Sequence, residues 1–79
     1  MRIKVDYDSV VNDVKITGDF FLHPEEGLTE IEGCLRGIDV NAEQNAIAER
    51  IRQVVSSRGM TLIGLNEDAL ARVLKEAMR

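Results

Sequence analysis

Residues 18–26, which read Gly-Asp-Phe-Phe-Leu-His-Pro-Glu-Glu, decide how this chain folds. Both phenylalanines of the sequence, its only histidine and its only proline lie within residues 20–24. Pro24 suits the first turn of a helix, because an N–H group at that position has no partner within the helix. Glu25 and Glu26 favour the positive N-terminal end of a helix dipole. The stretch therefore predicts a joint at which a strand ends and a helix begins.

Alternating apolar and polar residues before this joint predict two strands. Ile3, Val5 and Tyr7 alternate with charged residues, and the same period continues from Val14 to Phe20. Asp, Ser and Asn residues between the two segments favour a turn, so we expect them to pair as a hairpin. The alternation places residue 18, a glycine, on the buried face, which we interpret as a point where a helix backbone packs closely on the sheet.

Three helices are predicted after the joint. The first runs from Pro24 to Arg36 and is closed by Gly37 in the left-handed conformation. The second starts at Asn41, which forms a capping box with Gln44, and Asn66 caps the third. Apolar residues recur at helical spacing in all three segments. These stripes are Leu28, Ile31 and Leu35; Ile47, Ile51, Val54 and Val55; and Leu70, Val73, Leu74 and Ala77.

Residues 60–63 fit either a short third strand or an extended link. The sequence as a whole predicts an α+β fold of order β-β-α-α-(β)-α, in which three helices pack on one face of a small antiparallel sheet. We expect residues 1–79 to form a single domain, because this length is near the lower limit for independent folding without disulfides or metals.

Composition excludes several classes of function. The net charge of −4 argues against a nucleic-acid surface, which requires clustered Lys and Arg. We expect no membrane span, because no apolar run approaches ~20 residues, and no signal peptide. One cysteine excludes an internal disulfide framework and favours a reducing, cytoplasmic compartment.

No catalytic or metal-binding pattern is evident in the sequence. The glycines match neither nucleotide-binding fingerprint in spacing or context. His23, Glu25 and Glu26 come from one short segment, and such a segment rarely completes a metal site. Cys34 flanks the stripe of the first predicted helix, so we interpret it as a half-buried structural thiol. We therefore expect no catalytic residue, cofactor site or metal site in this chain.

The stretch from Gly18 to Pro24 resembles the small accessory domain of lipoate–protein ligases. The flanking residues 14–17 and the positions Leu28, Ile31, Leu35 and Gly37 extend the resemblance, which runs from about Ile3 to the C-terminus. In that family the domain is either the C-terminal part of a ligase or a separate small subunit. Relatives usually have a Gly-containing segment before the first strand, and we expect it here to be missing or supplied by the partner.

The resemblance implies a non-catalytic subunit that supports ATP-dependent adenylation of lipoate. ATP, Mg²⁺ and lipoate are then expected in a separate catalytic subunit, which would be the direct partner, with lipoyl-acceptor proteins as indirect partners. Two alternatives stay open. The chain also resembles iron–sulfur scaffold and sulfur-transfer proteins in layout, although it lacks their additional cysteines. It also fits a general protein-interaction module.

Exposed residues around the joint are the candidates for binding a partner. Two arrangements of the aromatic pair are possible: strand alternation would bury Phe20 and expose Phe21, or both rings fold under the first helix. The partner-binding candidates are Asp19, Phe21, His23, Pro24, Glu25 and Glu26.

Overall fold

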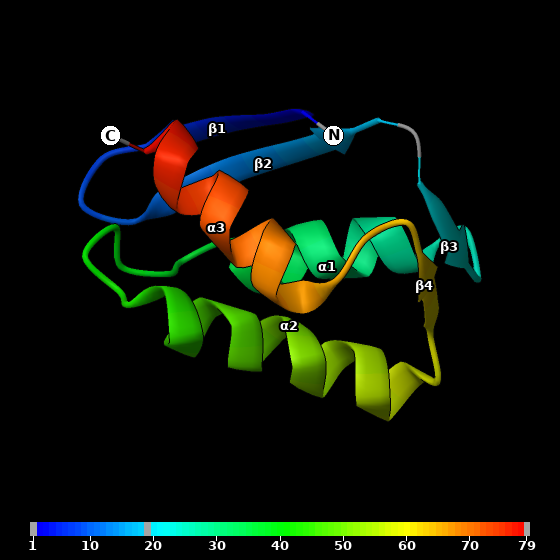
Figure 1. Cartoon of the computed structure of the whole chain (residues 1–79). Coiled ribbons are helices and arrows are strands. Elements are labelled where there is room, and N and C mark those ends of the chain that lie inside the picture. The colour runs from blue at the N-terminus through cyan, green and yellow to red at the C-terminus, as the bar shows by residue number, and fades with distance from the viewer. Residues whose placement is uncertain (1, 19, 79) are drawn as a thin grey trace.

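Seven helices and strands follow one another in residues 2–18 and 20–78, which the computed structural model describes (Figure 1). The α+β class and the predicted order of elements are confirmed, with one additional strand after the hairpin. The strands are β1 (Arg2–Tyr7), β2 (Val11–Thr17), β3 (Phe21–His23) and β4 (Thr61–Ile63). The helices are α1 (Gly27–Leu35), α2 (Gln44–Arg58) and α3 (Glu67–Ala77).

Strands β1 and β2 form the predicted antiparallel hairpin. Ile3 pairs with Ile16 and Val5 pairs with Val14, so the apolar positions of both strands face the same side. The intervening charged residues face solvent, as the period of two requires. Hydrophobic alternation was therefore sufficient to define this hairpin and its wet face.

All three helices lie on one side of the hairpin, in two layers. Helix α1 packs on β2 and helix α3 packs on β1, whereas α2 packs on α1 and α3 from the far side (Figure 1). A side-chain contact fixes α1 to the hairpin edge, because the Ile16 backbone N–H donates to Oε2 of Glu32 at 2.8 Å. The largest fully buried side chains of the core are Val11, Ile16, Ile31, Leu35, Ile47, Ile51, Leu70 and Leu74.

A second antiparallel sheet closes one end of the domain. Strand β3 pairs with β4, with Leu22 opposite Leu62, so residues 60–63 supply a strand, as one of the two interpretations proposed. This strand does not join the hairpin: β1 and β2 form one sheet and β3 and β4 another. The expected single sheet is thus divided in two, because the chain leaves the hairpin after Thr17 and starts a new strand at Phe21.

Gly18 causes this division, and its predicted role was wrong. It is exposed and packs under no helix. Its φ of 146° is a value that residues with a Cβ atom rarely adopt, and it ends β2. Alternation therefore does not continue from Val14 through to Phe20, and the side-chain pattern restarts in β3.

The predicted start of the first helix was also wrong. Helix α1 begins at Gly27, and Pro24 to Glu26 form a turn in which the Gly27 N–H donates to the carbonyl of Pro24 at 2.9 Å. The chain remains in β3 until His23, so three residues are needed to change direction before the helix begins. At the other end, Gly37 has the predicted positive φ, of 84°.

N-terminal caps were predicted for both α2 and α3; the prediction is wrong for α2 and confirmed for α3. Helix α2 begins at Gln44 without a side-chain cap, because Asn41 lies in a turn where its N–H donates to the Asp39 carboxylate at 2.8 Å. Asn66 caps α3 as predicted, since its Oδ1 accepts from the Ala69 N–H at 2.7 Å. None of the helices in the described part of the chain is long and apolar enough to cross a membrane.

Two glycines of α1 have opposite environments. Gly27 is buried, and a Cβ atom placed on it would lie 2.8 Å from Leu22 Cδ2 and 2.9 Å from Met60 Sδ. This close packing presses the start of α1 against the β3–β4 end of the domain. A Cβ atom on Gly33 would meet nothing within 4 Å.

This contrast predicts opposite effects of the same substitution. Gly33→Ala should raise the free energy of unfolding by about 0.5–1 kcal/mol, because alanine is the better helix former and the site has space. Gly27→Ala should lower it by about 1 kcal/mol or more, because the added methyl group overpacks the contact with Leu22 and Met60. Urea denaturation of both variants and the wild type measures the difference. A Gly27→Ala protein as stable as Gly33→Ala would contradict this account of the packing.

Candidate functional site

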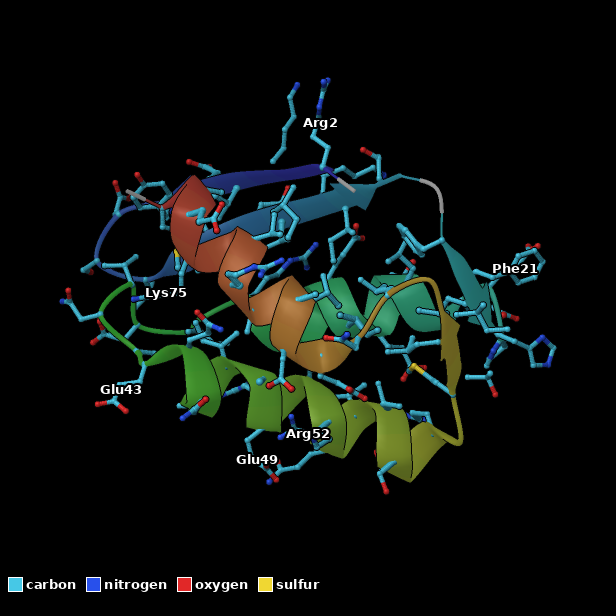
Figure 2. All side chains as sticks on the ribbon, in the orientation of Figure 1. Arg2, Phe21, Glu43, Glu49, Arg52 and Lys75 are labelled. Atoms are coloured by element: carbon cyan, nitrogen blue, oxygen red, sulfur yellow. The ribbon has the colours of Figure 1, made fainter. Side chains whose placement is uncertain are left out.

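The outer face of the β3–β4 sheet carries the two most exposed large apolar side chains of the described residues. Phe21 is 71% exposed and Ile63 is 61% exposed. The two residues are register partners across the strands, so their side chains lie side by side on one face. Figure 2 shows Phe21 pointing away from the body of the domain. We call these two residues the apolar pair.

The opposite face of the same sheet is anchored in the core. Leu22 is 7% exposed and packs at Gly27 and Met60, and Met60 is 8% exposed. Alternation along β3 thus turns Leu22 inward and both Phe21 and His23 outward. A two-stranded sheet alone has little stability. Packing of Leu22 against Met60 and Gly27 therefore holds in place the strands that carry the apolar pair.

A small hollow adjoins the apolar pair. It has a volume of about 260 Å³ and is lined by Phe20, Phe21, Leu22, Glu25 and Leu28. Pockets that bind small molecules usually measure roughly 300–1,000 Å³. The size and mainly apolar lining of this hollow suit a side chain of a partner protein better than a cofactor.

The predicted partner-binding residues are distributed over this end of the domain. Asp19 lies outside the described residues. Phe21 and His23 share the exposed face of β3, and Pro24 is partly buried. Glu25 and Glu26 are exposed in the turn before α1, and Glu25 also lines the hollow. In the described part of the chain, no group of three or more His, Cys, Asp or Glu is placed to hold a metal.

The arrangement of the two aromatic rings follows the first of the two possibilities. Phe21 is exposed, whereas Phe20 is partly buried and packs against the core. The prediction assumed that the second strand of the hairpin continues through both rings. In the structure β2 ends at Thr17, and Phe21 is the first residue of the separate strand β3, whereas Phe20 precedes that strand. Ile63 was missed by sequence reasoning, since its position beside Phe21, 42 residues earlier in the chain, depends on the pairing of β3 with β4.

Cys34 is half-buried, as the sequence indicated. Its side chain packs against the core, and burial raises the pKa of the thiol, although the nearby Arg50 guanidinium lowers it in part. The same guanidinium donates from Nε to the Cys34 backbone carbonyl at 2.9 Å. A thiol with a raised pKa is a poor nucleophile near neutral pH, because the reactive form is the thiolate. This environment favours a structural role over sulfur transfer.

Cys34 gives a direct test of that role. Cys34→Ala should lower the free energy of unfolding by roughly 1 kcal/mol through loss of packing and should not alter partner binding. Because the folded-state pKa is raised, the thiol stabilises the protein below the unfolded pKa, and this contribution is lost as pH rises through the folded pKa. Denaturation of the wild type and Cys34→Ala at neutral and alkaline pH measures both effects. Normal folding of Cys34→Ala with loss of function would reopen the sulfur-transfer alternative.

The fold and this surface define a small α+β domain whose exposed end presents an apolar pair beside an apolar hollow. Exposed apolar side chains on an anchored sheet are suited to contact with another protein.

The chain is similar to Lipoate-protein ligase A subunit 2 of Thermoplasma acidophilum. The two sequences are 31% identical over 61 residues, which is 76% of this chain and 65% of that protein. This chain thus spans slightly less than two thirds of the length of its relative. No family model matches the sequence.

The fold is similar to a chain in a solved structure of an archaeal lipoylation system from the same organism. That structure contains a bi-partite lipoate protein ligase and its E2 lipoyl domain. The TM-score is 0.71 at 27% sequence identity, and the match covers 98% of this chain and 78% of that chain. The resemblance to the small accessory domain of lipoate–protein ligases, first seen at Gly18 to Pro24, is therefore confirmed in sequence and in fold.

Proposed function

We propose that this chain is the non-catalytic small subunit of a two-part lipoate–protein ligase, which supports ATP-dependent formation of lipoyl-AMP by a separate catalytic subunit. The observation that carries the proposal is the combined sequence and fold similarity to the subunit of a two-part ligase. The proposal places ATP, Mg²⁺ and lipoate in the catalytic subunit and the complex in the cytoplasm. Lipoyl-acceptor proteins are then partners of the complex.

The apolar pair is the surface that we assign to the catalytic subunit. Large aromatic side chains are enriched among the residues that dominate binding energy, and Phe21 is the most exposed of the large apolar residues. Ile63 enlarges the same contact, and the hollow beside Phe21 can receive a side chain of the partner. His23 and Glu25 give this contact a polar rim, which is the usual composition at the edge of an interface.

A docked subunit can raise the rate of adenylation without contributing a reacting group. Lipoyl-AMP formation requires the lipoate carboxylate and the α-phosphate of ATP to be held in one geometry with water excluded. Closing a site and fixing its loops supplies both conditions. The part assigned to this chain is to stabilise the closed arrangement of the catalytic subunit.

Reconstitution tests the proposed function. The chain alone should release no pyrophosphate from ATP in the presence of lipoate. Addition of the chain to a catalytic subunit that lacks the small domain should start or strongly increase pyrophosphate release, in a lipoate-dependent manner. Mass spectrometry should detect lipoyl-AMP only in the mixture.

Two controls make this experiment decisive. Omission of lipoate separates adenylation from simple ATP hydrolysis, and gel filtration of the mixture shows whether a complex forms. Pyrophosphate release by the isolated chain would contradict the proposal. Formation of a complex without any gain in lipoyl-AMP would also contradict it.

A further inference from the structure

The outer face of the β1–β2 hairpin carries an ordered arrangement of charges. Lys4 lies directly opposite Lys15, and Asp6 lies directly opposite Asp13. All four side chains are exposed and face away from the helices. Like charges that are directly opposite each other in an antiparallel pair are destabilising, so neither pair helps the hairpin to form.

The two like-charged pairs differ in how they are compensated. Asp13 forms an ion pair with Arg36, with 3.2 Å between Oδ1 of the carboxylate and Nη2 of the guanidinium. This ion pair brings a positive charge to the acidic pair. The ion pairs found within residues 2–18 and 20–78 use Arg36, Arg52 and Arg58, and none reaches Lys4 or Lys15. The acidic pair is therefore offset by a direct ion pair, whereas the lysine pair has no ion pair among the described residues. Of those residues, the nearest opposite charges to the lysines on this face are Asp6 and Asp13, which lie diagonally across from them.

Arg2 extends the lysine pair into a cluster of three positive charges. It pairs with Thr17, so it stands diagonally across from Lys15 on the same face of the hairpin. Figure 2 shows the Arg2 side chain pointing away from the helices into solvent. We call Arg2, Lys4 and Lys15 the basic face. It holds three of the ten Lys and Arg residues of a chain whose net charge is −4, so its sign is opposite to that of the whole protein.

The basic face lies at the end of the hairpin that is nearer to the apolar pair. Arg2 begins β1 and Thr17 ends β2, and the chain then passes directly to β3 and Phe21. In Figure 1 this end of the hairpin and the β3–β4 sheet lie at the same side of the domain, and the β1–β2 turn lies at the opposite side. A single partner that covers the apolar pair can therefore also reach the basic face.

We propose that the basic face binds carboxylate groups on the catalytic subunit, next to the contact made by Phe21 and Ile63. This inference rests on the proposed function and specifies the chemistry of the matching surface: an apolar site flanked by Asp or Glu residues. Carboxylates are favoured over nucleic-acid phosphates, because the net negative charge of the chain repels a long polyanion. The local positive charge adjoins an apolar contact, which is typical of a protein–protein interface.

Such exposed charges act mainly on the encounter of the two subunits. Rim charges change the association rate and the salt dependence of binding more than they change the close contacts of the complex. Their effect falls as the screening length decreases from about 10 Å at 0.1 M salt to about 3 Å at 1 M.

Removal of the lysine pair tests the inference. The variant Lys4→Gln/Lys15→Gln and the control Arg72→Glu change the net charge by the same amount, and Arg72 is exposed on α3, away from the basic face. Stopped-flow or surface plasmon resonance measurements give association and dissociation rates for the catalytic subunit at several salt concentrations. At low salt the lysine variant should bind roughly tenfold more weakly, mostly through slower association, and the difference from wild type should nearly vanish at about 1 M salt. Its melting temperature should change little, because the substitution removes both the repulsion between the lysines and their diagonal attraction to Asp6 and Asp13.

The outcomes separate this inference from the proposed function. If wild-type chain forms no complex with the catalytic subunit, the proposed function fails and the inference fails with it. If wild type binds and the lysine variant binds equally well, or the control variant is weakened to the same extent, only the inference is wrong. A loss that persists unchanged at high salt would also overturn it. The same is true if the variant loses affinity for a single-stranded DNA oligonucleotide but not for the catalytic subunit.

Discussion

Phe21→Ala is expected to weaken binding of the catalytic subunit by ~2 kcal/mol or more, about a 30-fold increase in Kd, and to leave the melting temperature nearly unchanged. The ring is 71% exposed in the isolated domain, so its removal deletes little packing within the fold. In the complex it would become buried beside Ile63, where an aromatic anchor contributes strongly to affinity. Isothermal titration calorimetry and a thermal melt of the same preparation measure the two quantities.

Two further variants serve as controls for this prediction. Val10→Ala removes another exposed apolar side chain, which is 37% exposed and lies near the β1–β2 turn at the opposite end of the domain, and it should not affect binding. Phe20→Ala should lower the free energy of unfolding, by less than the roughly 3–5 kcal/mol typical of a fully buried phenylalanine, since Phe20 is only partly buried. Early melting of Phe21→Ala would place this ring in the folding core. Equal weakening by Val10→Ala would place the interface elsewhere.

Ile31→Ala is expected to lower the free energy of unfolding by about 2–5 kcal/mol. Ile31 is 0% exposed and lies in α1, which packs against β2, β3 and α2, so the cavity left by its side chain faces several elements at once. Small domains have total stabilities near the lower end of roughly 5–15 kcal/mol, so this single change can remove a large part of the total. Urea denaturation measures the loss, and the melting temperature should fall by roughly 4–8 °C for each kcal/mol.

Leu28 provides a matched control on the same helix. Its side chain is only partly buried, so Leu28→Ala should cost clearly less than Ile31→Ala. Binding of the catalytic subunit by Ile31→Ala should be normal below its melting temperature, because the residue reaches no surface. If Ile31→Ala and Leu28→Ala lowered the free energy of unfolding by similar amounts, the placement of Ile31 at the centre of the core would be wrong.

The sequence by itself determined the features that depend only on residues close together in the chain. The alternation of Ile3, Val5 and Tyr7 placed β1, and the helical spacing of Ile31 and Leu35 placed the buried stripe of α1. Asn66 was recognisable as a cap, because the bond from its side chain to the Ala69 N–H closes within four residues. These features depend on neighbours in the chain, which the sequence displays directly.

The errors occurred where a distant segment or a backbone conformation decided the outcome. Alternation could not show that Gly18 would adopt a φ of 146° and end β2. Pro24 satisfied the preferences of a helix start, but pairing of β3 with β4 kept the chain extended until His23. Asn41 and Gln44 had the spacing of a capping box, but a turn closed by Asp39 took the place of the first helical residues.

For the candidate site, the sequence determined that an aromatic residue, a histidine and two acidic residues lie together at one joint of the chain. The structure supplied the register that places Lys4 opposite Lys15, because an irregularity between Asp6 and Tyr7 shifts the pairing of the hairpin. Only the tertiary structure decided that Phe21 faces solvent and that Ile63 lies beside it. The physical reason is that a short strand of three residues has no periodicity of its own to read. Its register and exposed face are set by the strand that it meets and by the packing of Leu22 against Gly27 and Met60.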